Sequence, residues 1–210
     1  MKKFFSGKRL LIILAAATII GVVVAVHSCS NRVEPDLTIS YIGEGYFSSD
    51  EFYAAVPMLG DVIEDINGDR KKEIELVTIN FNSNLTASQQ QSNMAKMTMS
   101  MGQGKSRLYF MDRQYCEYYA DEEILVDLTE LVPEGAQTLV NSKGEVYGIS
   151  IEGNPVMREL GLYDTENVYV AMRAITEIDY VNYKNPGPEE MNKAAEDVLL
   201  YIVNYNNKEM

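Results

Sequence analysis

Short stretches in which apolar and polar residues alternate recur along the chain after residue 36, and segments with apolar residues three or four positions apart separate them. The alternation is typical of half-buried strands, and the wider spacing is typical of helices that pack on a sheet. We therefore expect strands at residues 37–42, 73–81, 106–111, 145–151 and 167–175. Helices are expected from residue 50, over residues 85–101, 112–119 and 155–161, and from residue 189 to about residue 205.

The succession of strands and helices predicts an α/β fold, with a mostly parallel sheet and flanking helices on both faces. In the last predicted helix the apolar residues form one stripe, which would pack on the sheet. These residues are Met191, Ala194, Ala195, Val198, Leu199, Ile202 and Val203. About 175 residues suffice for a single core, so residues 37–210 are expected to form one domain.

A longer apolar pattern precedes the domain. Residues 10–26 read LLIILAAATIIGVVVAV and contain no charged residue. As a helix this run is about 26 Å long, close to the roughly 30 Å of the hydrocarbon core of a bilayer. Basic residues precede the run and acidic residues follow it, so the N-terminus is expected in the cytoplasm. The sequence therefore predicts a basic cytoplasmic stub at residues 1–9, a transmembrane signal anchor at 10–26, a linker at 27–36 and an extracytoplasmic domain at 37–210.

Two other fates of the N-terminus are consistent with the sequence. Processing as a lipoprotein would attach lipid to Cys29, although His27 occupies a position that is normally small or apolar. Simple secretion would require cleavage after the apolar run, but Val26-His27-Ser28 is a poor cleavage site. All three routes place the domain outside the cytoplasm. In that setting a disulfide between Cys29 and Cys116 is open but not required.

Charge is distributed unevenly along the chain. The first 30 residues hold four of the 18 basic residues, so the remaining 14 basic and 31 acidic residues give a net charge of −17. Such a domain repels phosphate backbones and anionic lipid headgroups, which argues against nucleic acid as a partner. The only histidine, His27, precedes the domain, which removes Ser-His-Asp and Cys-His catalysis and histidine-ligated zinc. We therefore expect a protein that is not an enzyme; the alternative is an enzyme that uses carboxylates and tyrosines alone.

Acidic and amide side chains alternate in the segment from residue 65 to residue 73, which reads DINGDRKKE. Oxygen ligands at this spacing wrap one hard cation, with a main-chain carbonyl at the seventh position. The segment resembles calcium loops of the dockerin and integrin-repeat type, except that Arg70 stands where those loops usually have glycine. The predicted calcium ligands are Asp65, Asn67, Asp69, Lys71 through its carbonyl, and Glu73. The alternative is a metal-free Asn-Gly turn between a helix and a strand.

Three stretches, taken in order, resemble the first lobe of the extracellular solute-binding proteins that serve ABC importers. Residues 37–45 (LTISYIGEG) resemble the opening strand and its ligand-facing loop. Residues 106–129 resemble a strand, an acidic residue, an aromatic helix and a short segment that here reads VDLT, and residues 147–161 resemble a hinge strand before a helix that ends Glu-Leu-Gly. The resemblance implies one periplasmic-binding-protein-like lobe on a bacterial cell membrane, because the chain has no room for a second lobe.

The loops after the first and third predicted strands would lie at the carboxyl edge of the sheet, where open α/β folds bind ligands. The candidate ligand-binding residues in these loops are Glu44, Tyr46, Asp112 and Tyr115; ordinary helix caps and half-buried tyrosines are the alternative. The sequence thus predicts a membrane-anchored, non-enzymatic binding or interaction domain for a small solute or a partner protein. The alternative is a structural cell-surface domain that calcium stabilises and that binds no small molecule.

Overall fold

The computed structural model describes residues 34–205. Of these, residues 35–205 belong to one compact unit. The predicted anchor at residues 10–26 lies outside the described residues and stays a prediction. Within residues 34–205, no helix is both long enough and apolar enough to cross a membrane.

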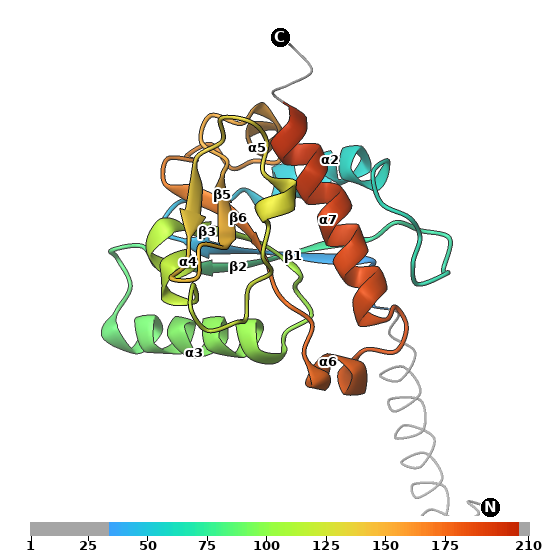
Figure 1. Cartoon of the computed structure of the whole chain (residues 1–210), viewed down its shortest axis with the longest axis horizontal. Coiled ribbons are helices and arrows are strands. Elements are labelled where there is room, and N and C mark those ends of the chain that lie inside the picture. Colours follow the sequence, from blue (N-terminus) through green and yellow to red (C-terminus); the bar gives the residue numbers. More distant parts are fainter. Residues whose placement is uncertain (1–33, 206–210) are drawn as a thin grey trace, which may run out of the picture. The chain divides into compact units, whose positions relative to one another are not determined.

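The described chain forms a six-stranded sheet with helices on both faces (Figure 1). The strands are β1 (Leu37–Gly43), β2 (Ile74–Asn80), β3 (Leu108–Asp112), β4 (Thr138–Val140), β5 (Val146–Ser150) and β6 (Val168–Met172). The helices are α2 (Ser49–Gly60), α3 (Ala87–Gln103), α4 (Arg113–Tyr118), α5 (Pro155–Glu159), α6 (Glu177–Asn182), α7 (Pro188–Asn204) and the 3-10 helix η1 (Thr129–Leu131). The prediction of an α/β fold with flanking helices is confirmed.

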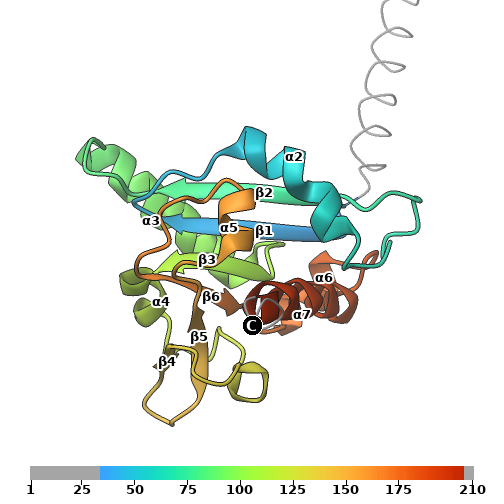
Figure 2. The ribbon, with the colours of Figure 1, turned by 90° about the horizontal axis from the view of Figure 1, so that it is seen from above.

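The sheet is mixed, so the prediction of a mostly parallel sheet is wrong. Its strand order is β2-β1-β3-β6-β5-β4. β1 runs parallel to β2 and β3, whereas β6 is antiparallel to β3, β5 to β6, and β4 to β5 (Figure 2). Helical crossovers join only the first three strands, through α2 and α3. The later connections reverse the chain instead, beginning with a β4–β5 hairpin whose turn contains Gly144 at a φ of 85°.

Alternate side chains of the central strands enter two separate cores. In β3, Leu108 and Phe110 join the core beneath α2, α5 and α7, whereas Tyr109 and Met111 join the core beneath α3 and α4. All seven residues of the stripe predicted for α7 are buried, which confirms that prediction. Helices cover both faces of the central sheet. Functional side chains can therefore reach a ligand where the strands begin and where they end, which we call the two edges of the sheet.

The two edges are made of different segments. We define the carboxyl edge by the ends of β1, β2 and β3 together with the start of β6. The amino edge comprises the starts of β1, β2 and β3 and the end of β6, which runs antiparallel to β3. The loop at residues 65–73 precedes β2 and α6 follows β6, so both belong to the amino edge.

Candidate functional site

A pocket of about 500 Å³ opens at the carboxyl edge. Three segments far apart in the sequence line it: the loop after β1, the junction of β3 with α4, and the segment that leads into β6. The parallel pairing of β1 with β3 and the antiparallel pairing of β3 with β6 bring these segments to the same edge. The strand order therefore builds the pocket.

The loop after β1 is held in place by hydrogen bonds from its backbone. The N–H of Glu44 donates to Oδ2 of Asp112 over 2.8 Å, and the N–H of Gly45 donates to the hydroxyl of Tyr41 over 2.9 Å. A Cβ atom on Gly43 would collide with the Asp112 carboxylate and the Tyr41 hydroxyl. Glycine at this position is therefore what allows the backbone to approach the two polar side chains.

Acidic side chains dominate the pocket. Its lining contains five carboxylates and one cationic side chain: Glu44, Asp112, Glu117, Asp164, Glu166 and Arg113. Nε of Arg113 lies 2.7 Å from Oε1 of Glu117, so this cation is already paired. The Gln114 amide donates to the Glu44 carboxylate over 3.0 Å. The pocket therefore presents a negative field to a ligand.

Burial and the neighbouring carboxylates shift the pKa values of two residues that line the pocket. Burial raises the pKa of the Asp112 carboxyl above its ordinary value; Glu44 and Asp164 raise it further by their charge, and the hydrogen bond from the Glu44 N–H opposes the rise. Burial, followed by the charge of Asp112, also raises the pKa of the Tyr41 hydroxyl above its ordinary range. A bound cation would relieve the repulsion among these carboxylates.

The structure brings together two of the four predicted ligand-binding residues. Glu44 and Asp112 both line the pocket and are joined by the hydrogen bond between them. Tyr46 does not line it, and its side chain is 73% exposed. Tyr115 does not line it either, because its ring stacks on Phe81 with 4.6 Å between the ring centroids.

Sequence reasoning missed the part of the pocket that precedes β6. Asp164 and Glu166 line it, but a parallel β6 would have placed the residues before the strand at the amino edge. Tyr41 was also missed, because an aromatic residue inside an apolar strand gives no sign that its hydroxyl reaches a loop. A better prediction would have required the direction of β6.

In the candidate calcium loop, side-chain oxygens accept hydrogen bonds from the backbone. Asp65 accepts from the N–H groups of Gly68 and Arg70, Asn67 accepts from Asp69, and Asp69 accepts from Lys71, each over 2.8 Å. Glu73 lies 3.6 Å from the Lys71 ammonium. Within residues 34–205, no group of three or more acidic, histidine or cysteine side chains is placed to hold a metal ion. Calcium binding by this loop stays a prediction.

Asp36 organises the same loop, although the sequence placed it in a linker. Its side chain is fully buried. Oδ1 accepts from the N–H groups of Ile66 and Asn67 over 2.8 and 3.1 Å, and Oδ2 accepts from the N–H of Glu73 over 2.8 Å. The residue that precedes β1 therefore fixes both ends of the loop that precedes β2.

Cys116 is a free thiol inside the core beneath α3 and α4 and is fully buried. Burial, followed by the charge of Glu117, raises the pKa of this thiol to about 12. Cys29 lies outside the described residues. The disulfide that the sequence left open therefore stays open.

Comparison with known proteins gives no match: no protein-family model, no curated protein and no solved structure is similar to this chain. The resemblance to solute-binding proteins thus rests on the three sequence stretches alone and stays a prediction.

Proposed function

We propose that this protein is a non-enzymatic binding domain, anchored in a cell membrane, that takes a small organic cation into the carboxyl-edge pocket. The observation that carries the proposal is the lining of the pocket, with five carboxylates against one arginine that Glu117 already pairs. Opposite charge within a few ångströms favours an ammonium or guanidinium group.

The distribution of the carboxylates favours an organic cation over a metal ion. A bare dication needs several oxygen atoms converging on one point, and no such convergence of acidic side chains occurs among residues 34–205. A volume of about 500 Å³ lies within the range of small-molecule sites. A ligand with one or two nitrogen cations would meet carboxylates that come from all three lining segments.

The membrane anchor at residues 10–26 and the extracytoplasmic position of the domain are part of the proposal. They are supported by the uncharged apolar run and by the basic residues that precede it. The likeness of three stretches to one lobe of a solute-binding protein supports a role in solute recognition. In this role the domain holds its ligand without changing it.

A thermal-unfolding screen tests the binding proposal. The full chain, in detergent micelles, would be heated with small amines, diamines and guanidinium compounds, with sugars and carboxylates as comparison ligands. A ligand present at 100 times its Kd raises the unfolding temperature of a domain of this size by roughly 5–10 °C. We expect such a shift for organic cations only.

Two matched variants locate the site. Asp112→Asn removes one pocket charge at nearly constant shape, and Asp121→Asn removes an exposed charge that does not line the pocket. We expect the cation-induced shift to shrink in the first variant and to persist in the second. Equal shifts in both variants would place binding elsewhere, and recovery of a chemically altered ligand would show an enzyme.

The mass of the membrane-extracted chain tests the anchor independently. We expect the intact chain of 23.6 kDa. A shorter chain that begins at a lipid-modified Cys29 would instead indicate lipoprotein processing.

A further inference from the structure

Helix α6 buries a charged residue and exposes apolar ones, the reverse of an ordinary surface helix. Its only buried residue is Asp179, which is fully buried. Its large apolar side chains point outward: Ile178, Tyr180 and Val181 are 40%, 52% and 68% exposed. A helix that faces water normally buries its apolar side and exposes its polar side, so the outer surface of α6 fits a partner that is not water.

These three residues also form the densest run of exposed large apolar side chains among residues 34–205. They fall within four consecutive positions, whereas no two of the other exposed residues of this kind lie so close together in the sequence. Single exposed apolar residues need no explanation, but a cluster marks a contact surface. We call Ile178, Tyr180 and Val181 the α6 apolar surface.

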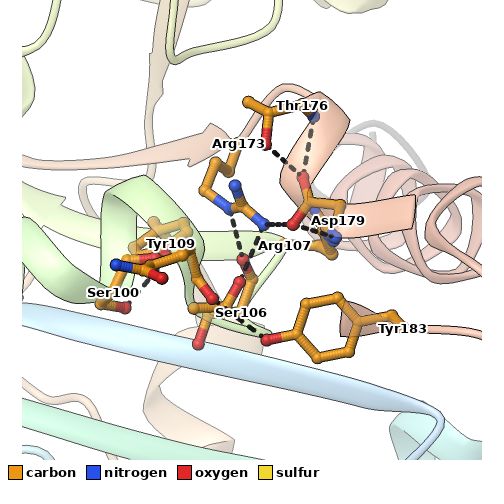
Figure 3. Close-up of polar contacts among 10 residues, drawn as sticks. Ser100, Ser106, Arg107, Tyr109, Arg173, Thr176, Asp179 and Tyr183 are labelled. Atoms are coloured by element: carbon orange, nitrogen blue, oxygen red, sulfur yellow. Dashed lines mark hydrogen bonds and ion pairs between the residues drawn. The ribbon is translucent and has the colours of Figure 1, made fainter. Parts of the chain in front are cut away.

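Buried polar contacts fix α6 to the rest of the domain. Nη2 of Arg173 donates to Oδ1 of Asp179 over 2.6 Å, and Nη1 of Arg107 donates to Oδ2 over 3.1 Å (Figure 3). The N–H and hydroxyl of Thr176 donate to the same carboxylate over 2.8 and 3.0 Å. Both arginine side chains are fully buried. These bonds hold the helix by its polar residue and thereby keep its apolar residues outside.

Contacts at the amino edge connect α6 to the beginning of the domain. The N–H of Arg107 donates to the carbonyl of Thr38 in β1. The amide of Asn185, which follows α6, donates to the carbonyl of Asn67, and the N–H of Asn67 donates to Asp36. The α6 apolar surface therefore belongs to the edge at which the chain enters β1.

We propose that α6 is a membrane-contact helix, with Ile178 and Val181 entering the interfacial layer of a bilayer and Tyr180 lying among the headgroups. The inference rests on the proposed anchor at residues 10–26. Ten residues, 27–36, then lead to β1 and span at most about 36 Å, which keeps the amino edge close to the membrane. Tyrosine with aliphatic residues is typical of the membrane interface.

The lipid in question is neutral. The domain is strongly acidic, so anionic headgroups would repel it. Contact through three apolar side chains is weak by itself. The covalent tether raises the local concentration of the bilayer and makes a weak contact sufficient.

Single tryptophan probes test the proposal, because the natural chain contains no tryptophan. Val181→Trp places a probe on the α6 apolar surface. Tyr163→Trp places a probe of similar exposure, 57% for the native side chain, beside Asp164 at the carboxyl edge. Each full chain would be reconstituted into phosphatidylcholine vesicles with brominated acyl chains, and its secondary structure checked by circular dichroism.

We expect the emission of Val181→Trp to shift to shorter wavelength and to be quenched by the bromine atoms, while Tyr163→Trp is unaffected. Quenching of both probes, or of neither, overturns the assignment of α6 to the bilayer. A blue shift without quenching identifies a protein contact, such as a second copy, and also overturns it. Failure of the chain to float with the vesicles removes the anchor and the inference with it, but leaves ligand binding at the carboxyl-edge pocket unaffected.

Discussion

The N–H of Glu44 donates a hydrogen bond to Oδ2 of Asp112 over 2.8 Å, and this bond joins the loop after β1 to the end of β3. It fixes the distance between two walls of the carboxyl-edge pocket. Burial and the charges of Glu44 and Asp164 oppose ionisation of the Asp112 carboxyl, and this hydrogen bond offsets them only in part. The affinity of the pocket for a cation should therefore depend on the charge of this one side chain.

We predict that cation binding weakens on acidification at a higher pH than an ordinary aspartate would cause. The pKa of Asp112 is raised in the fold, so a proton competes with the ligand sooner as the pH falls. Isothermal titration calorimetry at a series of pH values between 7 and 4 measures the effect. In Asp112→Asn we expect weaker binding at neutral pH and a flatter pH dependence; an unchanged profile would exclude Asp112 as the titrating group.

The raised pKa of Asp112 also makes the stability of the domain depend on pH in a defined direction. Because the folded-state pKa of Asp112 is raised, its contribution to stability is present below the unfolded pKa and is lost as the pH rises through the folded value. Asp112→Asn should therefore lose less stability than the natural chain between acid and neutral pH. Urea unfolding of the two chains at several pH values provides the comparison.

We predict that Gly43→Ala damages the pocket and the fold together. The added methyl group would meet the Asp112 carboxylate and the Tyr41 hydroxyl, and overpacking of this kind costs about 1–3 kcal/mol. Calorimetric unfolding should show a lower transition temperature, and cation binding should weaken. Gly102→Ala is the matched control, since a Cβ at that position meets no atom within 4 Å beyond its chain neighbours and its own helix backbone; a similar loss there would point to a general effect of alanine.

The strands and the α7 stripe could be predicted because burial imposes a period on the sequence. β1, β2 and α7 show that period over seven or more residues. β4 could not be predicted, because its three residues contain too little alternation. The direction of β6 was equally hidden, since a strand buried on both faces has the same pattern in either direction.

The candidate site was predictable only as far as it depends on the parallel strands. Glu44 and Asp112 follow β1 and β3 and could be placed at the carboxyl edge, whereas Asp164 reaches that edge only because β6 is antiparallel. The roles of Asp36 and Asp179 were inaccessible for another reason. Each carboxylate is bonded to groups 30 or more residues away, and no local pattern encodes such a pairing.

We predict a large loss of stability in Asp36→Ala. The N–H groups of Ile66, Asn67 and Glu73 would lose their acceptor, and an unsatisfied buried donor costs about 1–3 kcal/mol. The free energy of unfolding, measured with urea, should fall by about 3 kcal/mol or more. Asp61→Ala, at an exposed aspartate, should change it little; equal losses would mean that Asp36 has no special role.

Cys116 should resist alkylation in the folded protein. Burial, followed by the charge of Glu117, raises the pKa of its thiol to about 12, so very little of the reactive thiolate forms at neutral pH. Peptide mass spectrometry after iodoacetamide treatment should find Cys116 unmodified under native conditions and modified in guanidinium chloride. Rapid native modification, or a peptide linking Cys116 to Cys29, would contradict the packed position of this side chain.

Asp179→Asn should be among the most damaging single substitutions in the domain. Burial opposes ionisation of Asp179, but hydrogen bonds from Arg107 and Arg173 outweigh it and hold the pKa of this carboxyl well below its ordinary range. Removal of the negative charge leaves two buried guanidinium groups facing one another, and breaking a buried pair costs about 3–5 kcal/mol. Urea unfolding at neutral pH measures the loss.

The pH dependence and a triple variant separate charge from shape in this cluster. Because the folded-state pKa of Asp179 is depressed, its stabilisation is present above the unfolded pKa and is lost only as the pH falls through the lower folded value. Asp179→Asn should therefore lack the acid-dependent loss of stability that the natural chain shows at very low pH. Replacement of all three residues in Arg107→Met, Arg173→Met and Asp179→Leu removes the three buried charges of this cluster, so stability should recover most of the loss. If the triple variant is as unstable as Asp179→Asn, the hydrogen-bond geometry at α6, rather than the unpaired charge, sets the cost.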